Sequence, residues 1–496
     1  MMNHPLQTPG FALIAGLAAV ASEVSADVKL PPVFADHMVL QQQVKLPVWG
    51  TAGPGEGVTV KIAGQSVLTT AGNDGRWKLE LMPLSIGDPL EMTVQGNNTV
   101  TFKDVRVGEV WVCCGQSNMA LTLNATKDSA REIAAANFPN LRLFNGTGGP
   151  WTLCSPQPAA PFSAVAYYFG KHLQEGLDPV PIGLINISFS GTATEAWMPR
   201  ESPEAAVILG LRQESYRLNN AKYQADFERW KMDCEKAKAA GQPVPPEPRK
   251  MKRTAPAGIE TPGQYWPRVV AMAPYGIRGV IWYQGEANCW SIPAAEYQRV
   301  LLPAMIAQWR QTWGQGDFPF LMVQLPNYNY HPPYDSNTWP AFREAQQHVL
   351  DTVPNTGLAI TLDVGDMSNI HPVNKQPVGQ RLALWALTHT YGKQGLVFTG
   401  PRYKSVSVEG DKVRLTFDHV GGGLTWRDGK VTTGFEIAGA DGKYVQATPQ
   451  IDGNTVVLHR PEVASPVAAR YGWGDESLLT LMNKEGLPAW PLRSNP

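Results

Sequence analysis

The sequence predicts an α/β fold, in which a parallel β-sheet is covered by helices on both faces and a β-rich domain lies on either side along the chain. Between residues 107 and 395, apolar strands alternate with amphipathic helices, which is the pattern of a parallel sheet. Before and after this stretch, short alternating strands are separated by turns rich in Gly, Asn and Asp. With 496 residues, the chain is also longer than one hydrophobic core usually organises.

The N-terminus has the pattern of an export signal. An apolar run at 11–21 is followed by a small-x-small cleavage motif at 24–26. The run is too short to remain as a membrane anchor, and no later apolar segment is long enough to cross a bilayer. We therefore expect cleavage before Asp27 and a secreted or periplasmic protein with no membrane segment in its mature form.

The predicted domains follow the changes in strand and helix pattern. They are a signal peptide at 1–26, a β-sandwich-like domain at 27–106, an α/β domain at 107–395 and a β domain at 396–496. A charged helical segment at 204–260 interrupts the α/β pattern, and we expect it to be an insertion at the rim.

Each domain is predicted from particular elements. The N-terminal β domain has strands at 58–62 and 76–81, and the C-terminal one has strands at 413–417 and 456–459. The α/β strands are expected at 107–113, 141–144, 182–189, 277–283, 318–325 and 357–362. The α/β helices are expected at 163–177, 295–313, 341–353 and 377–391. Ligands of such sheets bind beyond the carboxyl ends of the strands, so the residues that follow the strands are the candidates for a site.

Composition excludes several classes of partner. The net charge is −1 and no Lys/Arg cluster is long enough to follow phosphates, so a nucleic-acid partner is not expected. The five cysteines form no CxxC pair and no His-rich spacing, so no metal and no cofactor are predicted. The adjacent Cys113 and Cys114 are expected to be small apolar residues of a buried strand, with a strained disulfide as the alternative. The sequence makes no prediction of the oligomeric state.

A serine follows the first α/β strand. The apolar run stops at a Gly-Gln-Ser-Asn turn at 115–118, which puts the hydroxyl of Ser117 at the mouth of the sheet. Such a serine is a nucleophile when the chain supplies a base and an oxyanion-stabilising site. Otherwise it is a turn residue that caps the following helix. The ends of the later strands decide between these interpretations.

A candidate base lies beyond a later strand, in the segment 363–372. We predict that Ser117 attacks a carbonyl carbon, and that His371 takes the serine proton and returns it to the leaving alcohol. Asp366 is the acid predicted to orient the histidine. Asp363, or a backbone carbonyl in place of any acid, is the alternative.

Two further strand ends supply candidates for holding the oxyanion and the substrate. The backbone amides of Ser117 and Gly191, with the side-chain NH2 of Gln284, are predicted to hold the oxyanion. Asn288 is the alternative donor, and Glu286 and Asn288 are predicted to bind substrate. All of these residues follow strands and are expected to meet at one edge of the sheet.

These motifs, in this order, resemble the SGNH-hydrolase superfamily and, within it, the sialate O-acetylesterase family of carbohydrate esterases. The matching blocks are 34–41, 74–77, 115–119, 162–169, 279–286, 370–372 with Lys375, Gly379 and 381–382, 434–439 and 486–489, so the resemblance covers nearly the whole mature chain. It implies an SGNH/flavodoxin-like three-layer α/β/α sandwich. It also implies metal-free hydrolysis of O-acetyl esters on sugars, with Ser117 as nucleophile and His371 as base.

Three positions depart from the superfamily pattern. Ser368 stands three residues before His371, where an aspartate is usual. Ser190 replaces a glycine in the glycine turn. Gln284 stands where the superfamily has an asparagine, and by analogy it inherits the oxyanion role.

The predicted function is that of a secreted serine esterase that removes O-acetyl groups from carbohydrates through an acetyl-enzyme. Its partner is then an acetylated sugar or polysaccharide, with sialic acid, xylan and other glycans as open alternatives. A carbohydrate-binding protein on an esterase scaffold is a second hypothesis, although pure binding needs no nucleophile and base. An esterase or lipase of the same fold that acts on a non-sugar acyl ester is the third.

Overall fold

The computed structural model describes residues 27–146, 148–248, 263–329, 337–431, 433–474 and 479–494. The predicted signal peptide at 1–26 lies outside the described residues, as does the end of the predicted insertion, 249–260.

The centre of the molecule is a mixed β-sheet in which parallel pairs predominate. Its strand order is β13 (Thr356–Ala359), β12 (Phe320–Val323), β11 (Gly279–Tyr283), β7 (Thr99–Gly115), β10 (Ile182–Asn186), β8 (Phe138–Asn145) and β9 (Thr152–Cys154). Neighbouring strands are parallel except at the edge, where β9 runs antiparallel to β8. The predicted parallel sheet is therefore correct for its central strands, and the edge strand makes it mixed.

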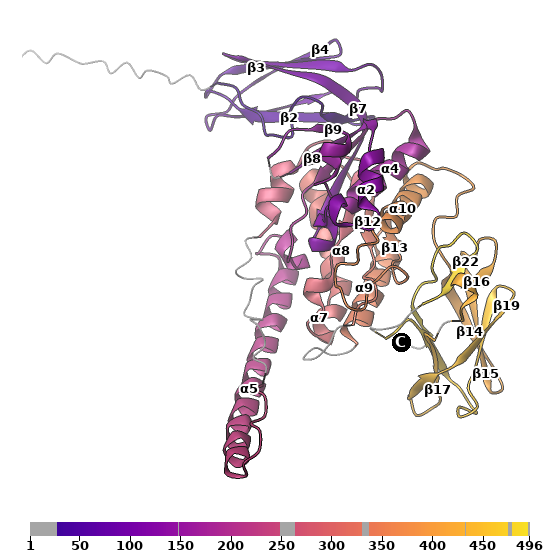
Figure 1. Cartoon of the computed structure of the whole chain (residues 1–496). Helices are drawn as coiled ribbons and strands as arrows, with labels where there is room; N and C mark the ends of the chain where they lie inside the picture. The colour runs from indigo at the N-terminus through magenta and orange to yellow at the C-terminus, as the bar shows by residue number, and fades with distance from the viewer. Residues whose placement is uncertain are drawn as a thin grey trace, which may run out of the picture.

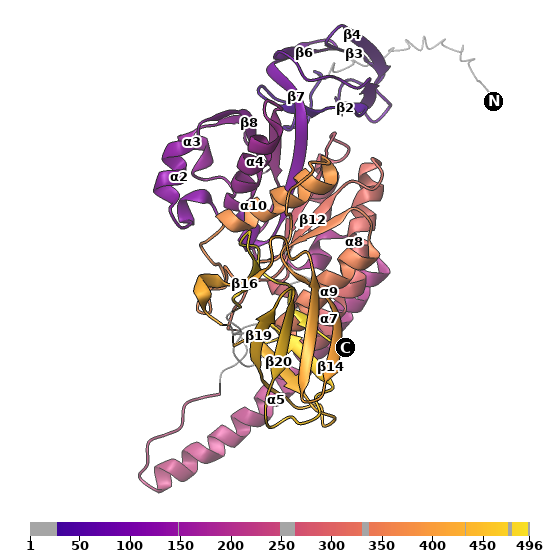
Figure 2. The same ribbon diagram turned by 90° about the vertical axis from the view of Figure 1, so that its right-hand side faces the viewer.

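Helices pack against this sheet because the strands are apolar on both faces. Figure 2 shows α4 (Ala164–Leu177) and α10 (Gln376–Trp385) on one side of the sheet and α8 (Gln298–Trp313) on the other. Trp309 of α8 packs against Trp282 of β11 and Phe320 of β12. The remaining short helices and α9 are α1 (Ser117–Ala120), α2 (Ser129–Ala135), α3 (Pro156–Ala159), α7 (Ile292–Glu296) and α9 (Thr338–Thr352). This mixed α/β arrangement is consistent with an SGNH-like esterase fold.

Strand β7 is shared by the N-terminal β-rich region and the central sheet (Figure 1). Its first half pairs antiparallel with β6 (Leu90–Gln95), and its second half pairs parallel with β10 and β11. The other strands of that region are β1 (Val39–Gln41), β2 (Leu46–Thr51), β3 (Gly57–Ile62), β4 (Gln65–Thr70) and β5 (Arg76–Leu81). The predicted boundary between residues 106 and 107 thus falls inside one continuous strand, and the division into domains stays a prediction.

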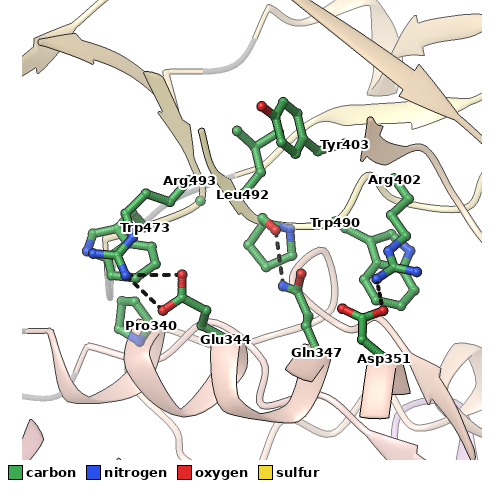
Figure 3. A pocket seen from close by; sticks show the side chains of 12 residues that line it. Pro340, Glu344, Gln347, Asp351, Arg402, Tyr403, Trp473, Trp490, Leu492 and Arg493 are labelled. Carbon is green, nitrogen blue, oxygen red and sulfur yellow. Dashed lines mark hydrogen bonds and ion pairs between the residues drawn. The ribbon is translucent and has the colours of Figure 1, made fainter. Parts of the chain in front are cut away.

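The C-terminal β-rich region is attached to helix α9. Its strands are β14 (Arg402–Glu409), β15 (Lys412–Asp418), β16 (Leu424–Trp426), β17 (Phe435–Ala438), β18 (Tyr444–Gln446), β19 (Thr448–Asp452), β20 (Thr455–His459), β21 (Ala468–Tyr471), β22 (Leu481–Asn483) and β23 (Leu492–Arg493). Figure 3 shows the junction, where Arg493 pairs with Glu344 at 2.9 Å and Arg402 pairs with Asp351. A cavity of about 200 Å³ lies between the two sides, and its charged side chains are paired across it.

The predicted insertion begins with α5 (Pro203–Ala239), a 37-residue helix that projects away from the sheet (Figure 1). Among the described helices, none is both long enough and apolar enough to cross a membrane. All five cysteines are buried and have free thiols. Cys113 and Cys114 are therefore strand residues of β7, and the alternative of a disulfide between them is wrong.

Candidate active site

The turn after β7 holds Ser117 at the carboxyl edge of the sheet. Gly115 has φ +134°, and a Cβ at this position would lie 2.1 Å from the backbone oxygen of Tyr283, so only glycine fits here. The amide of Gln116 donates to the same oxygen at 3.0 Å. This tight contact with the end of β11 sets the path of the chain, and Ser117 follows as the first residue of α1.

His371 meets this serine from the loop between β13 and α10. Its Nε2 lies 2.8 Å from Oγ of Ser117, and both side chains are half-buried. A neutral imidazole at this distance can accept the serine proton. Burial lowers the pKa of His371 below its ordinary value of 6.5, and the ammonium group of Lys375 lowers it further. The imidazole is therefore neutral, and competent as a base, at neutral pH.

The acid predicted behind His371 is not found there. Oδ1 of Asp366 instead accepts hydrogen bonds from the backbone N and the hydroxyl of Ser368, at 2.9 and 2.7 Å. These bonds lower the pKa of the Asp366 carboxyl. In the part of the chain that the structure describes, Nδ1 of His371 has no hydrogen-bonded carboxylate or carbonyl.

The alternative acid, Asp363, is occupied by two arginines. Arg381 contacts both of its carboxylate oxygens, at 2.6 and 2.7 Å, and Arg427 contacts one at 2.8 Å. Arg427 belongs to the C-terminal β-rich region and also donates to the backbone oxygen of Asp363 at 3.0 Å. This buried cluster fixes the start of the loop that carries His371, and it does not reach the imidazole as an acid would.

Two backbone amides are placed to hold an oxyanion. The N–H groups of Ser117 and Gly191 have no hydrogen-bond partner among the described residues. The turn that carries Gly191 is held beside the serine because the amide of Phe189 donates to the oxygen of Gly115 at 2.9 Å. Gly191 is exposed and has φ +74°, with open space where a side chain would lie. The two predicted amides therefore lie on adjoining turns.

The side chain of Gln284 does not join them. It is fully buried, and its Nε2 donates to Asn288 Oδ1 at 2.7 Å and to Gln116 Oε1 at 3.2 Å. Thr194 donates to its Oε1 at 2.8 Å. The predicted oxyanion role of Gln284 is therefore corrected, because its amide is committed to other protein groups beneath the site.

Asn288 and Glu286 are buried as well. Nδ2 of Asn288 donates to Glu195 at 2.9 Å, and Glu286 accepts from Asn118. With exposed fractions of 0% and 5%, neither side chain is open to a substrate, which corrects their predicted binding role. Among the described residues, no group of three or more His, Cys, Asp or Glu side chains could hold a metal ion.

Comparison with known proteins decides what this geometry belongs to. A family model described as carbohydrate esterase, sialic acid-specific acetylesterase, matches residues 265–387. The crystal structure of a carbohydrate acetylesterase from Xanthomonas citri is 34% identical, covers 95% of this chain and 100% of its own, and has a TM-score of 0.78. The chain belongs to the sialate O-acetylesterase family of carbohydrate esterases. It is a carboxylic ester hydrolase.

Mammalian members are similar over most of their length. The sialate O-acetylesterase of Rattus norvegicus is 29% identical over 472 residues, which is 82% of each chain. The one from Homo sapiens is 26% identical over 433 residues, covering 77% of this chain and 75% of its own. The similarity to this family of esterases therefore includes the β-rich regions and extends well beyond the matched residues 265–387.

Sequence reasoning assigned no role to two residues of this esterase that lie behind the serine and histidine. Asn118 is fully buried, and its amide contacts the His371 loop. Lys375 is 1% exposed, and burial lowers its pKa to about 7, against the opposing effect of Glu286. A signal was present, since Lys375 stands four residues after His371 in a matched block, but lysine in a loop is ordinarily a surface residue.

Proposed function

We propose that this esterase hydrolyses O-acetyl groups on carbohydrates through an acetyl-enzyme formed on Ser117. The observation that carries the proposal is the 2.8 Å contact between Oγ of Ser117 and Nε2 of His371 at the carboxyl edge of the sheet. The relatives support the substrate class, since they are named as sialate O-acetylesterases and a carbohydrate acetylesterase. On the same grounds we propose an SGNH-type three-layer sandwich for the central region.

The reaction follows from the pair. Oγ of Ser117 attacks the acetyl carbonyl carbon while Nε2 of His371 takes the hydroxyl proton. The oxyanion of the tetrahedral intermediate is held by the amides of Ser117 and Gly191. As the intermediate collapses, the imidazolium returns the proton to the sugar oxygen and the alcohol leaves. Water, deprotonated by His371, then attacks the acetyl-serine and releases acetate.

A first experiment tests the nucleophile. Release of the chromophore from 4-nitrophenyl acetate is measured with the wild type and with Ser117→Ala. Loss of an essential nucleophile lowers kcat by a factor on the order of 10³ or more. Intact-protein mass spectrometry after rapid quenching is expected to show one added acetyl group in the wild type and none in the variant. Equal turnover by the two proteins would overturn the proposal.

A second experiment identifies the sugar. Acetate release is compared between O-acetylated sialic acid and acetylated xylan at matched acetyl concentration. A higher kcat/KM on one of them assigns the substrate class, because discrimination is the ratio of these constants. Activity on 4-nitrophenyl acetate with none on either glycan would favour the non-sugar ester instead.

Export is proposed as well, from the signal pattern at 1–26. N-terminal sequencing of protein recovered outside the cytoplasm is expected to begin at Asp27. A mature protein that keeps Met1 would contradict it.

A further inference from the structure

Three buried polar side chains lie directly behind the serine and the histidine. They are Asn118, Glu286 and Lys375, with exposed fractions of 0%, 5% and 1%. They come from three separate segments: the β7–α1 turn, the end of β11 and the loop before α10. Burying a lysine and a carboxylate is costly unless both are paired, so a site that keeps them is a candidate for a functional role.

The contacts of Asn118 connect the serine turn to the histidine loop on both sides of His371. Its Nδ2 donates to the backbone oxygen of Ile370, the residue before the histidine, at 2.9 Å. Its Oδ1 accepts from Nζ of Lys375, four residues after the histidine, at 2.5 Å. The residue next to the nucleophile therefore holds the loop that carries the base at two points.

Glu286 completes the network. One of its carboxylate oxygens accepts from Nδ2 of Asn118, and the other has no partner among the described residues. Burial raises the pKa of Glu286, against the effects of Asn118 and Lys375. Nζ of Lys375 also lies 4.9 Å from the ring centre of Tyr283, so the ammonium group is enclosed on a second side.

We propose that Asn118 and Lys375 are positioning residues which hold the His371 loop on the Ser117 turn, in place of an acid on the imidazole. The proposal rests on Ser117 and His371 being the reacting pair. In a serine triad the acid fixes the histidine through Nδ1, and here no described group occupies that position. The two ties from Asn118 supply the missing restraint through the backbone and the side chain of the loop instead.

The same network sets the charge around the histidine. The groups that face it are Lys375 on its own loop and Glu286 at the end of β11, while the β7–α1 turn contributes only the neutral Ser117 and Asn118. Asp366, earlier in the loop, is bonded to Ser368. The ammonium group disfavours a second positive charge on the imidazole and lowers its pKa, after the larger effect of burial. Loss of the lysine charge is therefore expected to raise that pKa.

The experiment separates the tie from the charge. Lys375→Met removes both, and Lys375→Gln removes the charge but keeps a donor for Asn118. We expect Lys375→Met to lower kcat roughly tenfold or more and Lys375→Gln to restore part of that loss. Both are expected to move the acid limb of kcat/KM to higher pH, because this limb reports the pKa of the free enzyme's base. Asn118→Ala breaks both ties and is expected to lower kcat roughly 10²-fold with little change in KM.

A matched control removes an equally buried asparagine elsewhere. Asn483 is fully buried in β22 and is bonded to Thr399 and Leu487, so Asn483→Ala loses comparable hydrogen bonds without touching the loop. It is expected to lower Tm while leaving kcat and the pH profile unchanged. If Asn118→Ala does not fold, the pH limb of Lys375→Gln decides the question alone.

Two outcomes are distinguishable. If Ser117→Ala keeps turnover, the proposed function fails. If Ser117→Ala is inactive while the Lys375 variants keep the wild-type kcat and acid limb, the reacting pair stands and the positioning role is overturned.

Discussion

The two halves of the reacting pair are held in different ways. Ser117 sits on a tight turn that the backbone fixes, through Gly115 against Tyr283 and through the ladder of β7. His371 sits on a loop between β13 and α10 that is held by side chains, through Asn118 and Lys375 near the histidine. A backbone-fixed turn depends on the chain's local conformation, whereas a loop held by side chains depends on residues far away in sequence. Substitutions in the two regions should therefore fail differently.

The largest effect is expected from Gly115→Ala. The added Cβ meets the backbone oxygen of Tyr283, and φ +134° is strained for any L-residue, so the end of β7 must shift. A displacement of about 1 Å at the nucleophile lowers turnover roughly 10²-fold, and the strain is expected to cost about 1–3 kcal/mol of stability. Turnover of 4-nitrophenyl acetate and thermal unfolding measure the two effects.

Gly55→Ala is the matched control for that substitution. Gly55 also has positive φ, at +77°, but nothing lies within 4 Å of an added Cβ. It should cost about 1 kcal/mol and leave kcat unchanged. If Gly115→Ala keeps kcat within about threefold of the wild type, the turn is not the constraint that we describe.

This contrast explains what the sequence could predict. Ser117, Gly191 and His371 were found because each follows a strand at a recognisable turn, which is local information. Gln284 was misplaced because its neighbour Tyr283 gives no sign of where the next side chain points, and the direction depends on how β7 and β11 pack. Lys375 was missed because only the packed position of α10 buries it.

The same reasoning applies to the fold. The strands and helices of the central sheet were predicted from hydrophobic periodicity, with errors of a few residues at their ends. Strand β7 was divided at residue 106, since its first half alternates and its second half is continuously apolar. One strand can serve two environments, and periodicity reports the environment instead of the strand.

The next effect is expected from Asp363→Asn, which loosens the other end of the histidine loop. It leaves Arg381 and Arg427 without a partner anion, and breaking a buried ion pair costs about 3–5 kcal/mol. We expect kcat to fall roughly tenfold with the acid limb unchanged, because Asp363 restrains the loop at a distance from the imidazole. Chemical denaturation and a pH–rate profile give both readouts.

The control for Asp363 is an exposed ion pair. Asp418 pairs with Lys404 at 3.0 Å in the C-terminal β-rich region, and both side chains are more than half exposed. Asp418→Asn should change stability by less than about 1 kcal/mol. A loss of kcat near 10⁴-fold in Asp363→Asn would instead return Asp363 to the role of triad acid.

A smaller effect on turnover is expected from Gln284→Ala. Loss of an oxyanion donor lowers kcat by about 10²–10³-fold, whereas loss of a buried amide costs about 1–3 kcal/mol of stability. Because Gln284 is bonded to Gln116, Asn288 and Thr194, we expect the second result, with kcat reduced less than about tenfold. Gln346→Ala, at a fully buried glutamine of α9 bonded to Val323, provides the stability reference. A loss of 10²-fold or more with normal stability would restore the oxyanion role.

The smallest effect is expected from Asp366→Asn, and it tests the comparison most directly. An asparagine oxygen can accept the same two hydrogen bonds from Ser368, so the turn before His371 persists. We expect kcat within about threefold of the wild type and an unchanged acid limb in the pH–rate profile. If an acid held the histidine, this variant would instead lose turnover by orders of magnitude, as triad variants do. A large loss here, combined with a mild effect of Asn118→Ala, would mean that the histidine is held through its ring and not through its loop.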